Sequence, residues 1–355
     1  MTPSDTTTAE FLISIKPSER SFTAGAGETL LAAAIRHGVG LPYGCRDGAC
    51  GSCKCRKLSG AVRHNAHQSK ALSDEEETAG MVLTCCAIAL GDVVLESRQV
   101  TQTGSFPVKR MPARITQLER KSDDVMLLRL QLPTNESFSY HAGQYLDFLL
   151  PDGLRRSYSM ASAGPAPLQG ATLELHIRHL NGGVFTDRVF GAMKEKEILR
   201  LEGPFGSFCL REDSSKPMVL LASGTGFAPI KAILEYMQHK NITRPATLYW
   251  GGRRPQDLYL DDWVRAKLAE MPQLRYVPVV SDALPEDQWN GRSGFVHRAV
   301  LQDLPDLSGY QVYACGVPVM VESAQRDFAQ AGLPPDEFYA DAFTSEADKQ
   351  TKAPQ

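Results

Sequence analysis

The alternation of apolar and polar residues predicts a small, mixed region at the N-terminal end of the chain. Residues Phe11–Ile15 alternate and predict a strand, and Thr29–Arg36 has the apolar spacing of a helix. Beyond the last apolar run of this region the chain becomes polar and reaches Pro107. This change of composition predicts a first domain over residues 1–100 and a linker over residues 101–110.

Short alternating runs fill the next region of the chain. They span residues 113–118, 125–132, 145–150, 156–160 and 173–178. Runs of this length that follow each other closely are typical of antiparallel sheets. We therefore expect an antiparallel β-barrel domain over residues 111–212.

The pattern changes after Pro217, where apolar strands alternate with helical segments. The predicted strands span residues 218–222, 246–250 and 311–315, and the predicted helices span residues 229–237 and 263–269. Such alternation predicts an α/β domain with a parallel, doubly wound sheet. We expect this third domain over residues 213–345, followed by a flexible polar tail over residues 346–355.

The composition is that of an ordinary globular protein and narrows the function classes. Hydrophobic residues make up 43% of the 355, charged residues 22%, and the formal net charge is −3. Lysine and arginine are spread along the chain, so we expect no nucleic-acid partner. Residues 1–10 are polar and lack the features of a secretory signal, and the apolar stretch at residues 81–90 is far shorter than the ~20 residues of a membrane-spanning helix. We expect a cytoplasmic protein without a membrane span.

The cysteines give the first chemical signal. Six of the eight fall between residues 45 and 86, which in a reducing compartment indicates a metal site rather than a disulfide framework. Cys45, Cys50 and Cys53 have C-x4-C-x2-C spacing, and Cys85 follows after 31 residues. This spacing is the plant-type [2Fe–2S] ferredoxin arrangement. A four-cysteine zinc ribbon would need a second C-x2-C knuckle, which the sequence lacks.

The residues between these cysteines are small or turn-forming, as a loop that wraps a cluster requires. Since Cys86 directly follows Cys85, either could be the fourth ligand on spacing alone. The segments Tyr43–Cys55 and Leu83–Cys86 resemble the N-terminal ferredoxin module of the ferredoxin–NAD(P)H reductase superfamily. That resemblance implies a β-grasp fold for this domain and Cys85 as the fourth ligand.

A flavin signature lies in the predicted barrel. Arg156–Ser159 fits the R-x-Y-S motif of the same superfamily. Arg156 can offer a fork of donors to a phosphate, Tyr158 a flat ring to the flavin, and Ser159 a hydroxyl near its reactive nitrogen.

Two further segments support the flavin. Gly182 and Gly183 precede a predicted helix whose N-terminus can hold a pyrophosphate, and Thr186 adds a hydroxyl donor. Gly203–Gly206 resembles the turn that the superfamily places between its flavin and nicotinamide domains. The resemblance implies FAD as the bound flavin.

A glycine-rich turn after the first strand of the third domain carries the nicotinamide signature. Gly224, Thr225, Gly226 and Pro229 form a G-T-G-x-A-P motif, where backbone N–H groups can cradle a dinucleotide phosphate. Cys315 and Gly316 begin a stretch that resembles the C-G-x-x-x-M motif of the superfamily. This resemblance implies that Cys315 lies beside the nicotinamide ring.

The resemblance covers nearly the whole chain in the order ferredoxin, flavin, nicotinamide. The chain is similar to the reductases of multicomponent oxygenases and to CDP-6-deoxy-glucoseen reductases. Residues 249–259 and 338–343 resemble the second group most closely. The resemblance implies a flavoprotein oxidoreductase that passes electrons from NAD(P)H through FAD to the cluster, and on to an oxygenase or a CDP-deoxysugar dehydrase. Ser159, Cys315 and Phe343 are the expected catalytic residues, with Phe343 stacked on the flavin.

Two questions stay open in the sequence. The alternative function is a stand-alone NAD(P)H reductase of small acceptors such as flavin, quinone or iron. Arg253 and Arg254 could meet the 2′-phosphate of NADPH, whereas Asp257 would oppose it, and the prediction favours NADH. We expect the protein to act as a monomer.

Overall fold

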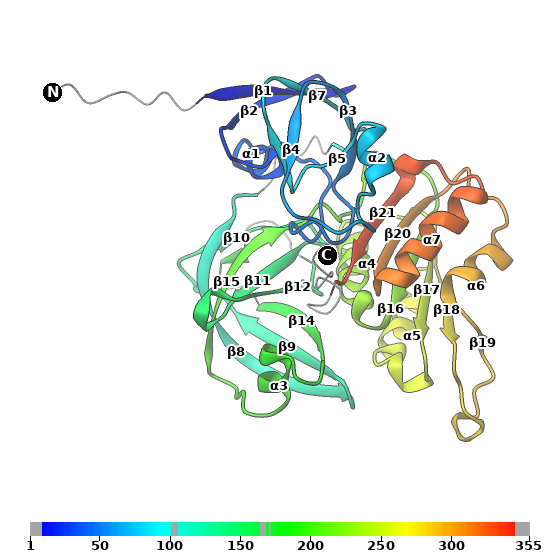
Figure 1. Ribbon diagram of the computed structural model, residues 1–355. Coiled ribbons are helices and arrows are strands. Elements are labelled where there is room, and N and C mark those ends of the chain that lie inside the picture. The colour runs from blue at the N-terminus through cyan, green and yellow to red at the C-terminus, as the bar shows by residue number, and fades with distance from the viewer. Residues whose placement is uncertain (1–8, 101–105, 164–167, 170–171, 345–355) are drawn as a thin grey trace. The chain divides into compact units, whose positions relative to one another are not determined.

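The computed structural model describes residues 9–100, 106–163, 168–169 and 172–344 (Figure 1). The chain forms two compact units, one running up to Phe106 and the other from Pro107 to Phe343. The first half of the predicted linker, residues 101–105, and the predicted tail lie outside the described residues. The strand that opens the second unit begins at Lys109, within the predicted linker.

The described part of the N-terminal unit contains a five-stranded sheet of order β2-β1-β7-β3-β5. These strands are β1 (Glu10–Lys16), β2 (Arg20–Gly25), β3 (Lys54–Ser59), β5 (Met81–Leu83) and β7 (Val93–Glu96). A short pair, β4 (Val62–His64) and β6 (Ala87–Ala89), and helices α1 (Leu30–Arg36) and α2 (Asp74–Thr78) complete the unit. The parallel pairing of β1 with β7 amid antiparallel neighbours fits the predicted β-grasp fold.

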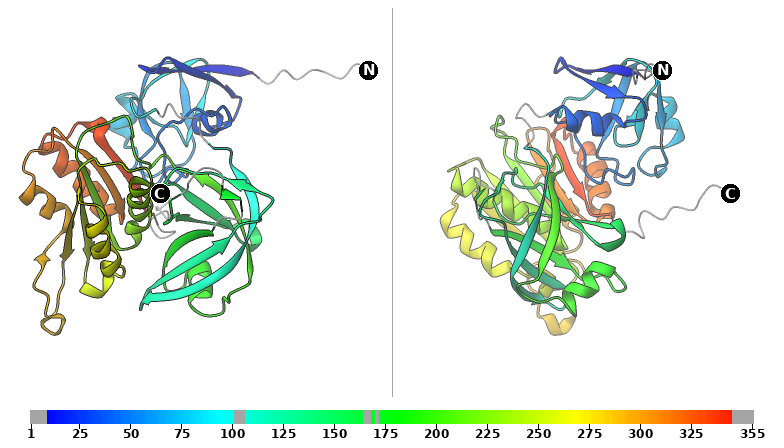
Figure 2. Two further views of the ribbon diagram at one scale, coloured as in Figure 1. Left: turned by 180° about the vertical axis from the view of Figure 1, so that it is seen from behind. Right: turned by 90° about the vertical axis from the view of Figure 1, so that its left-hand side faces the viewer.

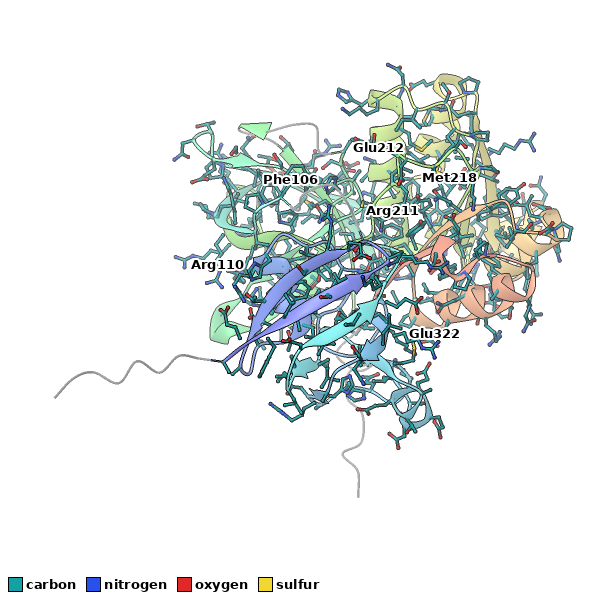
Figure 3. The ribbon with its side chains drawn as sticks, turned by 90° about the horizontal axis from the view of Figure 1, so that it is seen from above. Phe106, Arg110, Arg211, Glu212, Met218 and Glu322 are labelled. Carbon is teal, nitrogen blue, oxygen red and sulfur yellow. The ribbon has the colours of Figure 1, made fainter. Side chains whose placement is uncertain are left out.

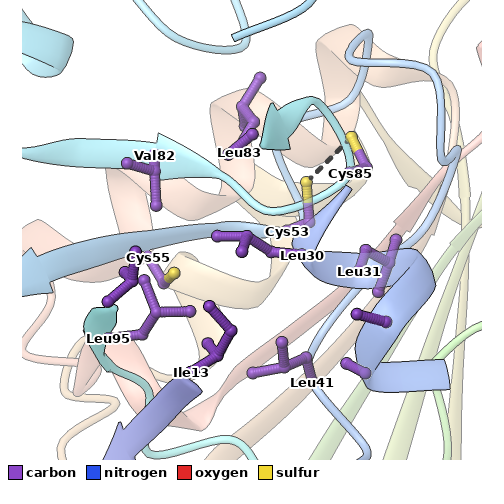
Figure 4. Packing of buried hydrophobic residues seen from close by; sticks show 14 of the residues in the cluster. Ile13, Leu30, Leu31, Leu41, Cys53, Cys55, Val82, Leu83, Cys85 and Leu95 are labelled. Atoms are coloured by element: carbon purple, nitrogen blue, oxygen red, sulfur yellow. Dashed lines mark hydrogen bonds between the residues drawn. The ribbon is translucent and has the colours of Figure 1, made fainter. Parts of the chain in front are cut away.

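The core of this unit follows from the sequence pattern. Alternation in β1 buries Ile13 and Ile15 completely, and α1 turns Leu30 and Leu31 toward the same core. Helix α1 begins at Leu30 because the hydroxyl of Thr29 accepts a hydrogen bond from the Ala32 N–H. Figure 4 shows this packing, with Cys53 and Cys85 at its edge.

The first half of the second unit is an antiparallel barrel-like sheet of order β12-β11-β15-β8-β9-β14. Its strands are β8 (Lys109–Ser122), β9 (Val125–Gln131), β11 (Tyr145–Leu149), β12 (Arg155–Ser159), β14 (Thr172–Arg178) and β15 (Ile198–Phe205). Helix α3 (Val184–Phe190) and the short pair β10 (Ser137–Phe138) and β13 (Leu168–Gln169) accompany it. Five of the six strands coincide with predicted runs, while β15 was not predicted.

The second half is a parallel sheet of order β19-β18-β17-β16-β20-β21. Its strands are β16 (Met218–Ser223), β17 (Ala246–Gly252), β18 (Leu274–Val280), β19 (Arg292–Ser293), β20 (Gln311–Gly316) and β21 (Phe338–Ala342). Its helices are α4 (Phe227–His239), α5 (Asp261–Glu270), α6 (Val296–Asp303) and α7 (Pro318–Gln330). Helices α4 and α5 cover one face of the sheet and α6 and α7 the other, each over its own core (Figure 2). The predicted doubly wound fold is confirmed.

The connection between the two sheets of this unit is fastened to the parallel sheet. The Arg211 guanidinium lies 4.9 Å from the centre of the Tyr339 ring, and its backbone N–H donates to the Tyr313 hydroxyl at 3.0 Å. Glu212, beside Arg211 in Figure 3, accepts a hydrogen bond from the Tyr236 hydroxyl. These contacts fix where the chain leaves the barrel.

Within the described part of the chain, every helix is too short or too polar to cross a membrane.

Candidate cofactor-binding sites

The four predicted cluster ligands lie in two pairs. Cys53, at the start of β3, and Cys85, just after β5, have their sulfur atoms 3.3 Å apart (Figure 4). Cys45 and Cys50 hydrogen-bond through their side chains, and the Cys45 N–H also points to the Cys50 sulfur at 3.4 Å. The Thr84 N–H and hydroxyl contact the Cys53 carbonyl oxygen, which holds the second pair together.

This arrangement fits a two-iron cluster better than a single metal ion. No three metal-binding side chains of the described residues are grouped to hold one ion. A tetrahedral metal with sulfur ligands at ~2.3 Å holds two of them a little under ~4 Å apart, so the 3.3 Å between the Cys53 and Cys85 sulfur atoms is close to the spacing that one iron needs. Two cysteine pairs therefore match two irons with two thiolates each.

The loop around these cysteines depends on missing side chains. Gly48 has a φ of +76°, and a Cβ there would lie 2.7 Å from the Cys86 sulfur. A Cβ on Gly44 would lie 3.3 Å from the Cys50 sulfur. Glycine is therefore required for the backbone to approach the sulfur atoms this closely.

The neighbouring Cys86 points elsewhere. Its sulfur lies 3.7 Å from the Ala66 carbonyl oxygen and packs beneath Gly48, although it is also 3.6 Å from the Cys85 sulfur. The sulfur of Cys85, not of Cys86, is the one next to Cys53. The geometry therefore favours Cys85 as the fourth ligand.

The predicted flavin residues lie on β12. Tyr158 packs between aromatic rings, with its centre 5.8 Å from Phe148 and 5.4 Å from Phe185, and burial raises the pKa of its hydroxyl. Arg156 pairs with Phe148 in the sheet register and is half-buried. Ser159 is buried at the end of the strand. One strand thus presents the guanidinium, the ring and the hydroxyl within four residues.

The glycine pair before α3 forms a tight turn. Gly183 is the N-cap of α3, and a Cβ there would lie 2.5 Å from the Thr186 hydroxyl oxygen. That hydroxyl donates to the Leu180 carbonyl oxygen and accepts from the Leu180 N–H. The structure thus gives Thr186 a turn-stabilising role, in addition to the phosphate contact that the sequence predicts.

The predicted nicotinamide motifs meet at the carboxyl end of the parallel sheet. A Cβ on Gly226 would lie only 2.1 Å from the Cys315 carbonyl oxygen, so the two backbones are in direct contact. Gly316 has a φ of +140° and packs against Ser223, whose hydroxyl accepts from the Val317 N–H at 3.1 Å. Two motifs about ninety residues apart in the sequence, a separation typical of doubly wound sheets, therefore form one surface.

The glycine turn Gly224–Gly226 also contacts β17 of its own sheet and β14 of the barrel. The indole N–H of Trp250 donates to the Gly224 carbonyl oxygen at 3.1 Å. A Cβ on Gly224 would lie 2.6 Å from the guanidinium of Arg178, which comes from β14 of the barrel and pairs with Asp124. The missing side chain of Gly224 therefore lets the Arg178 guanidinium lie close to the turn, whose backbone N–H groups could hold a phosphate.

The flavin and nicotinamide residues come together through an acid that the sequence analysis missed. The Ser159 hydroxyl donates to the Asp341 carboxylate at 3.3 Å, across 182 residues of sequence. Asp341 pairs in register with the buried Cys315 on the neighbouring strand, and the Phe343 N–H donates to the Gly316 carbonyl oxygen. Asp341 thus contacts Ser159 and lies beside Cys315 on the neighbouring strand, and Phe343 follows it two residues later in the chain.

A buried ionic cluster joins the barrel to the parallel sheet, and the sequence analysis missed it too. Lys231 on α4 is 5% exposed and contacts Glu174 on β14 at 3.0 Å and Glu235 at 2.5 Å. His176 lies between Glu174, at 3.2 Å, and the Tyr259 hydroxyl, at 2.7 Å. A local pattern could show the i,i+4 pair of Lys231 and Glu235 but not the contact with Glu174, which belongs to the other domain.

The protonation states in this cluster follow from burial and pairing. Burial lowers the pKa of His176 despite the neighbouring carboxylate, so the imidazole is neutral. Burial alone would raise the pKa of Glu174, but His176 and Lys231 lower it overall. A neutral His176 that donates from Nε2 to Glu174 and accepts at Nδ1 from Tyr259 satisfies every group in the chain of contacts.

Three family models match the chain in the same order as the three folds. The 2Fe-2S iron-sulfur cluster binding domain matches residues 13–90, the oxidoreductase FAD-binding domain residues 112–209, and the oxidoreductase NAD-binding domain residues 220–326. These matches confirm the predicted cofactors: a [2Fe–2S] cluster, FAD and a nicotinamide nucleotide.

Proteins of similar length match nearly the whole chain. The CDP-6-deoxy-L-threo-D-glycero-4-hexulose-3-dehydrase reductase of Yersinia pseudotuberculosis is 39% identical over 93% of this chain and 98% of its own. Reductase component 1 of terephthalate 1,2-dioxygenase from Comamonas is 34% identical over 94% and 97%. The crystal structure of the Amycolatopsis cytochrome P450 reductase GcoB matches with a TM-score of 0.76 and 33% identity, over 94% of this chain and 99% of that one.

We predict that replacing Cys85 with serine removes or destabilises the cluster, because thiolates hold its irons. Iron and sulfide analysis and the visible spectrum would measure the loss. Cys86→Ser is the matched control and should keep a full cluster. The reverse result, with iron retained in Cys85→Ser and lost in Cys86→Ser, would exchange the two assignments.

We predict that Gly226→Ala blocks reduction by nicotinamide, because the new methyl group would overlap the Cys315 carbonyl oxygen. Displacing the turn by about 1 Å should slow flavin bleaching by NAD(P)H roughly 10²-fold. Dithionite should still reduce the variant. Gly309→Ala, where a Cβ meets nothing within 4 Å, is the control and should react normally.

We predict that Lys231→Met lowers the stability of the second unit by about 3 kcal/mol or more, because it leaves buried carboxylates without their cation. The three tryptophans all lie in the parallel-sheet domain, so fluorescence-detected unfolding reports on it. Lys240→Met, at the exposed end of the same helix, should change stability little. Equal effects of the two substitutions would contradict the role of the buried cluster.

Proposed function

This chain belongs to the NAD(P)H-dependent iron–sulfur flavoprotein reductases, and we propose that it carries electrons from NADH to a partner enzyme. The observation that supports this most directly is the contact between Ser159 and Asp341. It joins the end of the flavin strand to the edge of the nucleotide sheet, where hydride transfer requires the two rings to meet.

The predicted residues form three sites, one for each cofactor. When bound, the nicotinamide supplies a hydride, the flavin takes two electrons and releases them singly, and the cluster accepts one at a time. Arg156, Tyr158, Gly182, Gly183 and Thr186 would hold the flavin. Gly224, Thr225, Gly226, Pro229 and Gly316 would hold the nucleotide. Cys45, Cys50, Cys53 and Cys85 would hold the cluster.

The reaction centre is built to exclude water. Cys315 is fully buried, and both burial and the nearby Asp341 raise the pKa of its thiol, so it stays protonated. Ser159 and Asp341 are also buried, and their hydrogen bond orients the serine hydroxyl. Phe343, anchored through its N–H at Gly316, would cover the flavin until nicotinamide enters.

The electron acceptor that we propose is the oxygenase or dehydrase component of a two-protein system. The relatives include a reductase named for a CDP-sugar dehydrase and reductases named for terephthalate dioxygenase and an aromatic O-demethylase. They match this chain over 90% or more of its length. One electron-transfer module can serve such different terminal enzymes, because the acceptor is recognised on its surface.

We further propose that the protein acts as a monomer in the cytoplasm. One chain holds residues for all three cofactors, so no second copy is needed to complete the path. None of its eight cysteines, all within the described residues, forms a disulfide, which suits a reducing compartment.

The proposed electron path predicts two separable activities. With NADH, the native protein should reduce both a dye that accepts electrons directly from flavin and the one-electron probe cytochrome c. Cys85→Ser should keep dye reduction and lose most cytochrome c reduction, because only the second uses the cluster. Cytochrome c reduction at the native rate in Cys85→Ser would contradict the order of carriers. Rapid turnover with free flavin or quinone and none with any protein acceptor would favour the stand-alone reductase.

A further inference from the structure

The order of the strands in the parallel sheet indicates the direction in which a nucleotide would lie along the carboxyl ends of the strands. Strands β20, β16, β17 and β18 lie side by side in that order. Cys315 lies near the carboxyl end of β20, and the glycine turn Gly224–Gly226 directly follows β16. A dinucleotide with its nicotinamide at Cys315 and a phosphate at Gly224–Gly226 therefore extends its adenosine toward the loops after β17 and β18.

The loop after β17 begins with two arginines. Gly252 ends the strand, and Arg253 and Arg254 follow. In nucleotide-binding sheets an arginine near this point accommodates the 2′-phosphate of NADPH, whereas NADH presents a hydroxyl there. The contacts of these two guanidinium groups therefore bear on the choice between NADH and NADPH.

The Arg254 guanidinium is already engaged by a carboxylate. Its Nε lies 2.6 Å from Asp287 Oδ2 and its Nη2 lies 2.7 Å from Asp287 Oδ1, a bidentate fork. Glu286 adds a second carboxylate at 3.7 Å. Both Asp287 and Glu286 come from the loop after β18, so the contact closes one loop of the nucleotide edge onto the next.

The surrounding loop fixes this fork in place. Asp287 Oδ2 also accepts from the Leu284 N–H at 2.8 Å, and the Asp287 side chain is only 10% exposed. On the arginine side, Asp257 accepts from the N–H groups of Arg253 and Arg254, which sets the turn. Asp257, which the sequence analysis counted against a phosphate, thus has a structural role in the turn.

We propose that Asp287 sets the preference for NADH by occupying the guanidinium of Arg254 that would otherwise bind a 2′-phosphate. A phosphate approaching this fork must displace a carboxylate that already satisfies it, and it meets the repulsion of Asp287 and Glu286. A ribose hydroxyl brings no charge and meets neither obstacle. This inference rests on the proposed function and names the residue that selects its electron donor.

The test compares kcat/KM for NADH and NADPH, measured with the holoprotein and a dye that accepts electrons directly from flavin. Asp287→Asn keeps the shape and an acceptor for the Leu284 N–H but releases Arg254. Its kcat/KM for NADPH should rise about tenfold, the value of one freed charge-assisted contact, while that for NADH stays within about twofold. The double variant Arg254→Gln/Asp287→Asn should lose the gain.

Matched controls separate this mechanism from a general change of charge. Glu286→Gln removes a carboxylate that is 68% exposed and only loosely placed, so it should raise NADPH use less than Asp287→Asn. Arg253→Gln/Asp287→Asn should keep most of the gain, because Arg253 is not part of the fork. Asp287→Ser repeats the test if the asparagine variant fails to fold, as judged by tryptophan fluorescence.

The contradicting results are distinct. No rise with NADPH in a folded Asp287 variant that still oxidises NADH would overturn the inference, as would a gain that survives in the double variant with Arg254→Gln. A native protein that prefers NADPH would also overturn it while leaving the electron path intact. Flavin that neither nucleotide reduces would instead refute the proposed function itself.

Discussion

The buried ammonium of Lys231 is the interaction on which the arrangement of the second unit depends. Removing this charge from water is costly. Glu235 offsets part of the cost from the same helix, whereas Glu174 on β14 offsets it only while the barrel and the parallel sheet keep their present positions. The extension through His176 to Tyr259 adds a second connection between the same two domains. Because a buried charge without its partner is strongly unfavourable, the cluster selects one relative placement of the two sheets.

That placement is what the reaction centre requires. The contact of Ser159 with Asp341 is a single, moderately long hydrogen bond, too weak alone to align two domains. The ionic cluster around Lys231 aligns the two domains. The backbone contact of Gly226 with Cys315 limits how closely a nucleotide can approach the sheet. Rigid packing therefore comes from one set of residues and reactivity from another.

Charged pairs serve two different purposes in this protein. The pair of Lys231 and Glu174 is buried and holds domains together, whereas the fork of Arg254 and Asp287 lies at the edge of the sheet, where a nucleotide competes for it. The difference follows from the exposure of the cations, since the Arg254 side chain is 26% exposed and the Lys231 side chain only 6%. Water and ligands can therefore reach the first cation but not the second. The same chemistry thus yields stability in one place and selectivity in another.

Sequence by itself determined the fold class, the three cofactors and their order, because each depends on short-range features. Each motif lies within about ten neighbouring residues, because its side chains or N–H groups must come from one short stretch of backbone. These motifs are the ligand spacing in Cys45–Cys53, the R-x-Y-S strand and the glycine turn. Strand β15 was missed although Leu199 and Leu201 alternate with polar residues in it. The roles of Asp341, Lys231 and Glu174 were missed because their partners lie far away in the sequence. Spacing alone left Cys85 and Cys86 as alternatives for the sulfur that faces Cys53, and only the resemblance implied Cys85. Whether Arg254 is available to a phosphate was left open. Only the tertiary structure decided these points, since their partners are brought together by folding across tens to hundreds of residues.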